Sequence, residues 1–297
     1  MISPETQAPH WEWYYIAMYF YLGGVSAGAY LVGSLLELLG KERFQAISKA
    51  AYYIAFPLIL VTPILLIADL GSPLRFWRLF SYMNTTSPLS VGTWALLVYG
   101  GMSFLSFVNV LAIDGRLKSP GLTKFHAVFS RIPHKVYAAA GSFFGFFVAG
   151  YTGVLVNTTA RPLWAATDPL IGPIFIVSAA STGAAAIVLF MMNQKTGTDE
   201  TFGHLEAFDR MAMILEIALI VAMIAIAGRY AAPILTGFYG VLFLGGTVLL
   251  GILVPLWINW RGQKLVAAKT DPVMLSAILV LFGGLMLRIS LVQAGQM

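Results

Sequence analysis

Residues 51–69 read AYYIAFPLILVTPILLIAD, an apolar run whose only charged side chain is its last residue, Asp69. A helix needs roughly 20 apolar residues to cross a hydrocarbon core of about 30 Å, so this run predicts a transmembrane helix. Seven more runs of this kind occur, at residues 14–38, 92–113, 134–156, 171–192, 211–228, 236–258 and 273–293. None shows the short alternation of an outer-membrane barrel strand. We therefore expect an all-α integral membrane protein with eight transmembrane helices.

The composition supports this assignment. Of the 297 residues, 59% are hydrophobic and 10% are charged, and the mean hydropathy is +0.81. This is more apolar surface than a water-soluble domain of that length buries. The first run follows a start without basic residues, so we do not expect it to be a cleaved signal sequence. No linker divides the sequence, and we expect one membrane domain over residues 1–297, with the helices packed as two four-helix bundles.

The distribution of lysine and arginine predicts the orientation in the membrane. Thirteen of the 18 basic residues lie in alternate connections, at residues 39–50, 114–135, 193–210 and 259–272. Four lie in the remaining connections, and Arg288 lies within the last run. Because cytoplasmic loops carry the excess of basic residues, we expect both termini on the outer face. The net charge of +5 reflects this bias and does not indicate nucleic-acid binding.

The sequence has no cysteine, which excludes disulfides, an iron–sulfur cluster held by this protein alone and thioether-linked haem. Its four histidines are His10, His126, His134 and His204. None lies within a predicted span except His134, which begins one, whereas a membrane haem usually takes its axial histidines from inside spans. We therefore expect no haem in this protein, and we expect its redox cofactors to belong to a partner or to the lipid phase.

The connection after the second run concentrates charge that the rest of the sequence avoids. Residues 69–94 read DLGSPLRFWRLFSYMNTTSPLSVGTW. Asp69 ends a span, where a carboxylate needs hydration or a partner. Arg75 and Arg78 follow in one loop, together with aromatic rings suited to the membrane interface. Taken alone, the stretch is typical of an interfacial belt with a local acid–arginine pair.

A second stretch on the same predicted face changes this interpretation. Residues 151–164 read YTGVLVNTTARPLW and again combine a tyrosine, an arginine and a Pro-Leu-Trp. The first stretch contains an acid followed by Gly-x-Pro and Arg-Phe-Trp, and it ends in Ser-Pro-x-x-x-Gly-x-Trp. The second stretch contains Tyr-x-Gly followed by Arg-Pro-Leu-Trp. As a set these motifs resemble the polysulfide reductase NrfD-like family of membrane subunits. The eight-span layout with both ends outside is similar to that of the family's shorter members.

The resemblance implies a subunit of the bacterial or archaeal plasma membrane that exchanges electrons between the quinone pool and a ferredoxin-like iron–sulfur subunit. That partner would bind a catalytic, often molybdopterin-containing, subunit. The implied cofactor is a quinone, menaquinone or ubiquinone, with no metal in this protein. By motif position, Tyr151 matches a family tyrosine near the quinone headgroup. The first span of the family carries a histidine that is absent here, where Tyr15 and Tyr19 stand instead and His10 precedes the span.

Three groups of candidate residues follow. A quinol releases protons as it releases electrons, so its site needs hydroxyl and carboxylate groups. The expected quinone-binding residues are Tyr15, Tyr19, Asp69, Tyr151 and Arg288. The expected partner-docking residues are Arg75, Trp77, Arg78, Arg161 and Trp164. The expected proton path contains Glu37, Asp114 and Glu216.

Alternatives remain for these residues and for the whole protein. Tyr15 and Tyr19 share one face of a helix, but tyrosines also gather at this depth for packing. Glu216 either starts a proton path or fixes helix packing through a buried polar contact, and Arg288 either faces the interior with a carboxylate or snorkels to the interface. The protein as a whole is alternatively a secondary transporter or proton channel, or an anchor that only docks a partner.

Overall fold

The computed structural model describes residues 11–39, 44–70, 72–81, 83–159, 161–262 and 271–297, so His10 lies outside the described residues. Within these residues, eight helical segments are long and apolar enough to cross a membrane, which confirms the predicted class. The long elements are α1 (Met18–Leu38), α2 (Gln45–Ala68), α4 (Pro88–Ile113), α6 (His134–Asn157), α8 (Ile171–Gln194), α9 (Asp199–Ala227), the π-helix η6 (Val241–Leu253) with α12 (Val254–Gly262), and α13 (Asp271–Ala294). The short ones are η2 (Trp13–Ala17), η4 (Pro73–Arg75), α3 (Arg78–Ser81), α5 (Pro120–Phe129), α7 (Pro162–Ala166), η5 (Gly228–Ala231), α10 (Ala232–Leu235) and α11 (Gly237–Gly240).

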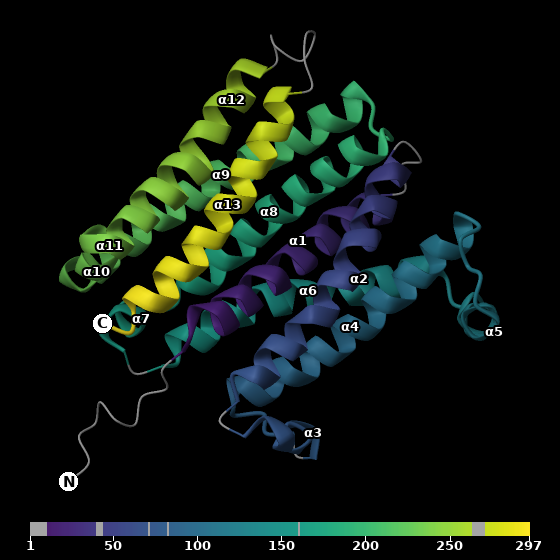
Figure 1. Cartoon of the computed structure of the whole chain (residues 1–297), viewed down its shortest axis with the longest axis horizontal. Helices are drawn as coiled ribbons and strands as arrows, with labels where there is room; N and C mark the ends of the chain where they lie inside the picture. Colours follow the sequence, from purple (N-terminus) through teal and green to yellow (C-terminus); the bar gives the residue numbers. More distant parts are fainter. Residues whose placement is uncertain (1–10, 40–43, 71, 82, 160, 263–270) are drawn as a thin grey trace.

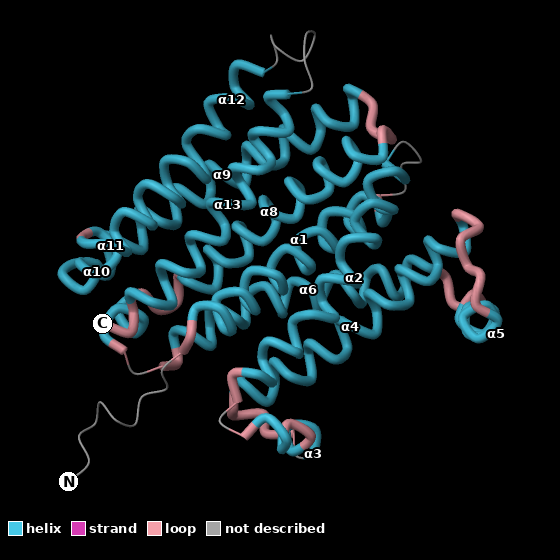
Figure 2. Tube along the Cα trace, viewed as in Figure 1, coloured by secondary structure: helices cyan, strands magenta, loops and turns pink. Residues whose placement is uncertain are grey.

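The long helices run up and down between two ends of the molecule (Figure 1). Short helices and loops lie at those ends, while the middle is continuous helix (Figure 2). We call the end that carries Trp11 and the C-terminus the termini face; α3, α7, α10 and α11 lie there. The other end, the opposite face, carries α5 and the α8–α9 connection.

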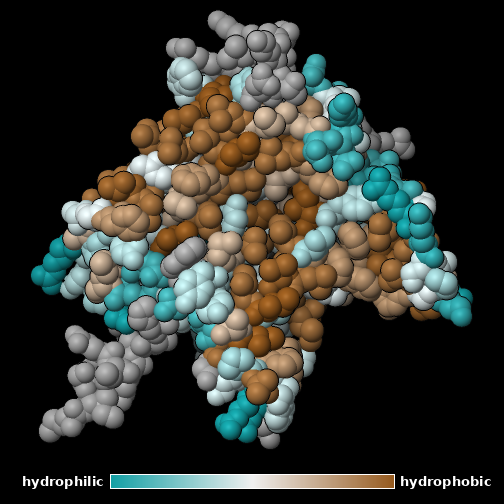
Figure 3. Space-filling model, in the orientation of Figure 1, coloured by the Kyte–Doolittle hydropathy of each residue, from teal (hydrophilic) through white to brown (hydrophobic). Residues whose placement is uncertain are grey.

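The helices form two groups of four, as expected. In the first group α1 packs on α2 and α6, and α4 closes the ring between them. In the second, α8 packs on α9 and α13, and η6 with α12 packs along α13. The groups meet where α1 crosses α8. Apolar side chains cover the middle of the surface, with hydrophilic ones towards its ends (Figure 3), which is the pattern expected of a bilayer belt.

The crossing of α1 and α8 depends on two glycines. A Cβ atom on Gly28 would lie 1.7 Å from the carbonyl oxygen of Ala179, and one on Gly183 would lie 2.2 Å from the amide nitrogen of Ala29. The two backbones therefore touch directly, as small residues allow in membrane helix pairs.

Gly28→Ala is expected to separate the two groups of helices. The new methyl group would displace backbone rather than a flexible side chain, and we expect a loss of about 3 kcal/mol in the free energy of unfolding. The matched control is Gly100→Ala in α4, where a Cβ meets nothing within 4 Å. Thermal unfolding in detergent should show a lower midpoint for Gly28→Ala only, and equal midpoints would contradict this account of the crossing.

The structure corrects two connections that the sequence suggested were loops. Residues 199–210 are not a loop but the first turns of α9, which begins at Asp199. Thr198 caps this helix by accepting a hydrogen bond from the amide of Thr201 at 3.3 Å, and two acidic residues in the first turn favour its N-terminus. Likewise, part of the 114–135 connection is helix α5. Charged residues hid both helices from a search based on hydropathy.

The two ends of the described chain are tied together. The amide of Trp11 donates to Gln296 Oε1 at 2.7 Å, and Gln293 Nε2 and Gln296 Nε2 both donate to the carbonyl of Trp11 at 2.9 Å. The ring of Trp11 stacks on Trp164, with 5.2 Å between centroids. Trp164 Nε1 donates to the carbonyl of Leu291 at 2.8 Å. We call this cluster the termini clasp; it joins the start of the first helix to the end of the last.

Candidate functional site

Two buried tyrosines meet near the termini face, inside the first group of helices. Tyr19 of α1 is 1% exposed and Tyr151 of α6 is 5% exposed. Their hydroxyl groups are hydrogen-bonded to each other. Each phenol carries one hydrogen and only one is needed for this bond, so the pair keeps one hydroxyl hydrogen free to donate. A buried, preplaced donor of this kind suits a carbonyl-bearing ligand.

Gly92 explains one of the motifs found in the sequence. A Cβ at this position of α4 would lie 2.0 Å from the ring of Tyr151, so the ring lies directly on the helix backbone. On its own helix, the ring stacks on Phe147 at 6.1 Å with an interplanar angle of 6°. The glycine of Ser-Pro-x-x-x-Gly-x-Trp and the tyrosine of Tyr-x-Gly are therefore two halves of one contact.

Asp69 follows α2 directly, at the termini face. Partial burial, with a smaller effect from the charge of Glu12, raises the pKa of its carboxyl group to about 6. Within the described residues, no hydrogen bond or ion pair joins Asp69 to Tyr151. Asp69 lies instead in the electrostatic neighbourhood of Glu12 and Tyr14.

The structure separates the two tyrosines that were expected to act together. Tyr15 lies in the π-helical turn η2, where the ordinary four-residue spacing no longer aligns side chains. It is partly exposed and contacts the ring of Tyr14 at 4.6 Å. Tyr19, one turn further, is buried against Tyr151. Of the two, only Tyr19 contributes to the buried pair.

Arg288 points into the bundle, which decides between its two alternatives in favour of the interior orientation. It is 1% exposed and donates to Ser178 Oγ at 2.5 Å and to the carbonyl of Gly284 at 3.0 Å. Its guanidinium lies 5.0 Å from the ring centroid of Phe175. A Cβ on Gly24 of α1 would lie 3.2 Å from Nη2, so Arg288 occupies the junction of the two helix groups rather than the tyrosine site.

One alternative for Arg288 included a carboxylate companion, and in the structure this companion is Glu216. Glu216 is 4% exposed, which confirms that it points inward, and it interacts electrostatically with Arg288. Ser178 is a hydrogen-bond partner of both residues. A buried arginine and a buried carboxylate thus face each other across α8, α9 and α13, with a hydroxyl between them.

Asp209 was not expected from the sequence, and it continues this cluster toward the opposite face. Asp209 is 7% exposed and accepts a hydrogen bond from Ser181 Oγ at 2.5 Å. A cavity of about 20 Å³ beside it, lined among others by Glu206, Asn259 and Ser276, has room for about one water molecule. Asp209 and Glu216 are seven residues apart and so share a helix face, a signal that becomes visible once α9 is extended.

The other two expected proton-path residues lie in the first group of helices. Glu37 accepts from Tyr52 Oη at 2.7 Å and is paired with His134 Nδ1. Asp114 pairs with Lys49 at 2.6 Å, and this bond lowers the pKa of its carboxyl group. Glu37 and Asp114 are therefore not brought together with Glu216.

The expected docking residues divide into two sets. Arg75, Trp77 and Arg78 are exposed around η4 and α3 at the termini face, with the Arg78 guanidinium 5.8 Å from the Trp77 ring. Arg161 is partly buried and donates to the carbonyl of Gln296 at 3.3 Å. Trp164 is 0% exposed. It belongs to the termini clasp and offers no surface to a partner, which corrects its assignment as a docking residue.

Comparison with known proteins accounts for these features together. The family model described as polysulphide reductase, NrfD, matches residues 3–297. The chain belongs to the NrfD family. The tyrosine–glycine contact and the Arg-Pro-Leu-Trp clasp are thus features of an NrfD-family membrane domain.

Three relatives show how far the likeness extends. One chain of the polysulfide reductase of Wolinella succinogenes is 28% identical, over 96% of the present sequence and 94% of the relative. An NrfD homologue of Haemophilus influenzae is 25% identical, over 97% and 96%. One subunit of the selenate reductase of Mesobacillus selenatarsenatis is 29% identical, over 60% of the present sequence and 46% of the relative. The likeness to the first two spans the whole NrfD domain.

Proposed function

We propose that this NrfD-family protein is the quinone-reactive membrane subunit of a respiratory reductase complex. It exchanges electrons between the quinone pool and a ferredoxin-like iron–sulfur subunit, which binds at the termini face. A further catalytic subunit, of the molybdopterin type, acts on the terminal substrate. Family membership supports this, as do the two relatives named as components of a polysulfide reductase and a selenate reductase. The termini face is then the outer face of the plasma membrane, in agreement with the lysine and arginine distribution.

The observation that carries the proposal is the buried Tyr19–Tyr151 pair with its free hydroxyl hydrogen. A quinone headgroup presents carbonyl oxygens that accept hydrogen bonds, and these residues fit that group. The free hydroxyl hydrogen would hold one carbonyl. Gly92 and Phe147 fix the ring of Tyr151, so the donor is oriented before a ligand arrives.

A bound quinone supplies two-electron, two-proton chemistry. The protein's part is to orient the headgroup and to move protons. The tyrosine hydroxyls donate and accept in turn, and Asp69 at the termini face exchanges protons with water. A carboxyl group with a pKa of about 6 both accepts and releases protons near neutral pH.

Quinone-dependent oxidation of a reduced viologen dye by the purified complex tests this function. Activity that requires added quinone, together with co-purification of an iron–sulfur subunit, is the expected result. A complex that transfers electrons without any quinone, or a protein that purifies without redox partners and transports a solute, would contradict the proposal.

The pH dependence of quinol oxidation is expected to report Asp69. Partial burial raises its pKa to about 6, so the proton-accepting carboxylate is scarce below that pH and predominant above it. The rate should therefore rise roughly tenfold between about pH 5 and pH 7. Asp69→Asn should be slower and lack this step, whereas Asp168→Asn, an exposed acid outside the spans, should keep it. A step retained in Asp69→Asn would assign it to another group.

The docking surface is expected to be the exposed aromatic–arginine patch of η4 and α3. Cysteines introduced at Arg75, Trp77 or Arg78 should form cross-links to the iron–sulfur subunit in the assembled complex. A cysteine at Lys124 in α5, on the opposite face, serves as the matched control and should give none. Cross-links from Lys124 alone would place the partner on the wrong side for this proposal.

We further propose that turnover is coupled to proton movement through the second group of helices. Asp209, Glu216 and Arg288 form a row of buried ionisable groups from the opposite face toward α1. Ser181 donates to Asp209, and Ser178 bridges Glu216 and Arg288. Buried ionisable groups in a membrane domain mark proton or ion paths. This row supports a route that reaches the junction of the two helix groups.

A further inference from the structure

The ends of α1, α2, α4 and α6 enclose a cavity of about 540 Å³ at the opposite face, away from the tyrosine pair. Eight of the ten residues that line it have polar side chains, and the lining is drawn from all four helices. The residues that line it are Glu37, Gln45, Ser48, Lys49, Tyr52, Asn109, Val110, Ile113, His134 and Lys135. No step of the proposed quinone reaction uses this space.

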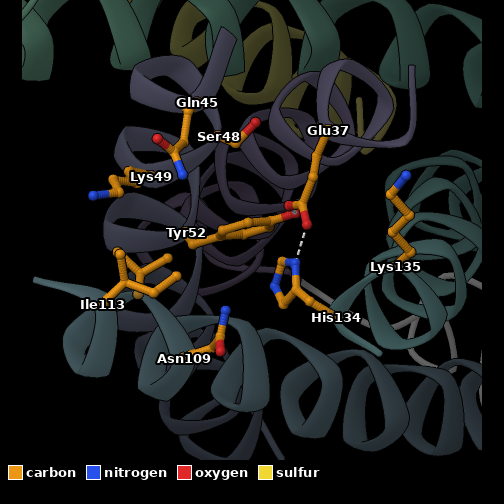
Figure 4. A pocket seen from close by; sticks show the side chains of 10 residues that line it. Glu37, Gln45, Ser48, Lys49, Tyr52, Asn109, Ile113, His134 and Lys135 are labelled. Carbon is orange, nitrogen blue, oxygen red and sulfur yellow. Dashed lines mark hydrogen bonds and ion pairs between the residues drawn. The ribbon is translucent and has the colours of Figure 1, made fainter. Parts of the chain in front are cut away.

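The single carboxylate of this lining is already occupied. Glu37 accepts from Tyr52 Oη at 2.7 Å and is paired with His134 Nδ1. These two bonds hold the imidazole and the phenol in place, as Figure 4 shows. Ser48 Oγ donates to the carbonyl of Gly33, and Lys49 donates to Asp114. The side chains left to donate to a ligand are those of Gln45, Asn109, His134 and Lys135.

Several of these donors converge. Asn109 Oδ1 faces His126 Nε2 at 3.4 Å, which turns the amide nitrogen of Asn109 into the cavity (Figure 4). The amide nitrogen of Gln45 points into the same space. His134 Nε2 is buried and has no hydrogen-bond partner within the described residues. An acceptor-rich anion is the group that satisfies these three nitrogen atoms as donors.

The surroundings favour an anionic lipid over a free anion. Lys135 lines the cavity and adds positive charge, on the face where the excess of basic residues lies, whereas the charge of Lys49 is paired with Asp114. Its remaining border is apolar: Val110 and Ile113 belong to α4, and Ile113 is 55% exposed at the end of that helix. A ligand with a charged head and hydrocarbon chains matches both borders.

We propose that this cavity binds the phosphate group of an anionic phospholipid. Gln45, Asn109 and His134 hold the phosphate oxygens, Lys135 provides charge, and the acyl chains run along α4 past Ile113. The Glu37–His134–Tyr52 cluster is then a positioning element that orients the imidazole toward the headgroup. The lipid fills the open end of the first helix group.

Native mass spectrometry of the detergent-purified protein tests this, with phosphatidylglycerol, phosphatidylcholine and inorganic phosphate as separate probes. Phosphatidylglycerol should bind about tenfold more tightly than phosphatidylcholine, and inorganic phosphate should not displace it. Asn109→Asp and Gln45→Glu, which place a negative charge beside the phosphate, should each weaken phosphatidylglycerol binding about tenfold. Gln194→Glu, which adds the same charge on the same face outside this lining, should leave binding unchanged.

Gln45→Glu distinguishes a loss of lipid binding from misfolding, because an acid in the first turn of α2 favours the helix. Its thermal midpoint should equal or exceed that of the wild type while lipid binding falls. Equal binding of the two lipids, or unaltered binding in both lining variants, would overturn the proposal. Displacement of the lipid by inorganic phosphate would overturn the lipid assignment and leave a site for free phosphate.

Discussion

Tyr151→Phe is expected to slow quinone-dependent turnover about 10²-fold while the complex still assembles. The substitution removes a hydroxyl group and keeps the ring, which continues to stack on Phe147 and to lie over Gly92. It leaves Tyr19 with no hydroxyl partner, so the preplaced donor of the pair is lost or misdirected. Tyr19→Phe should have a similar effect, and the double variant little more, because the two hydroxyls act as one unit.

Tyr99→Phe is the matched control. Tyr99 is also a fully buried tyrosine of the first helix group, and its hydroxyl is 2.9 Å from Ser26 Oγ. The Tyr99→Phe variant loses one buried hydrogen bond, which should lower the free energy of unfolding by about 1 kcal/mol. The readouts are steady-state quinol oxidation and quinone binding in the purified complex. Undiminished turnover in both Tyr19→Phe and Tyr151→Phe would show that the quinone reacts elsewhere.

Arg288→Leu is expected to destabilise the membrane domain by about 3–5 kcal/mol, because it leaves the carboxylate of Glu216 buried without its counter-charge. Removing both charges, in Arg288→Leu with Glu216→Leu, should recover most of this loss. The pair then behaves as a coupled unit, as expected from their shared contacts with Ser178. Thermal unfolding of the wild type, both single variants and the double variant measures the coupling directly.

The same double variant separates packing from proton movement. In proteoliposomes it should oxidise quinol at close to the wild-type rate, since the tyrosine pair is untouched. It should build no membrane potential, because the buried row is interrupted at Glu216. Glu216→Gln should give the same result if it assembles. A wild-type potential in an assembled variant would leave the Glu216–Arg288 pair with a structural role only.

Some of this structure was predictable because membrane physics constrains it strongly. The first apolar run, residues 14–38, coincides with the spanning segment Tyr14–Leu38. The inward orientation of Arg288 follows from the cost of exposing a guanidinium to hydrocarbon. The contribution of Gly28 to a helix crossing follows from its lack of a side chain. In each case one contribution to the free energy, such as the cost of a charge in hydrocarbon, is larger than the other contributions at that position.

Other features were hidden because apolar helices give few clues to their rotation and neighbours. The pairing of Tyr19 with Tyr151 depends on which faces of α1 and α6 meet, and apolar residues surround both tyrosines in sequence. Trp164 looked like an interfacial ring, but the two ends of the protein fold over it. Asp209 lay in a charged segment that resembles a loop, although a capping threonine and the helix dipole make it helical. These outcomes depend on tertiary contacts that composition does not encode.

The termini clasp bears on how the protein is made. Trp11 lies before the first long helix in the sequence and is synthesised well before its partners Gln293 and Gln296. The first helix therefore enters the bilayer and waits through the synthesis of seven more spans before it can make these contacts. The clasp therefore closes only after α13 has been made, and α1 lacks this tie while the helices between them are inserted. Closure of the clasp is thus a late step of assembly, a difference that assembly factors and proteases can read.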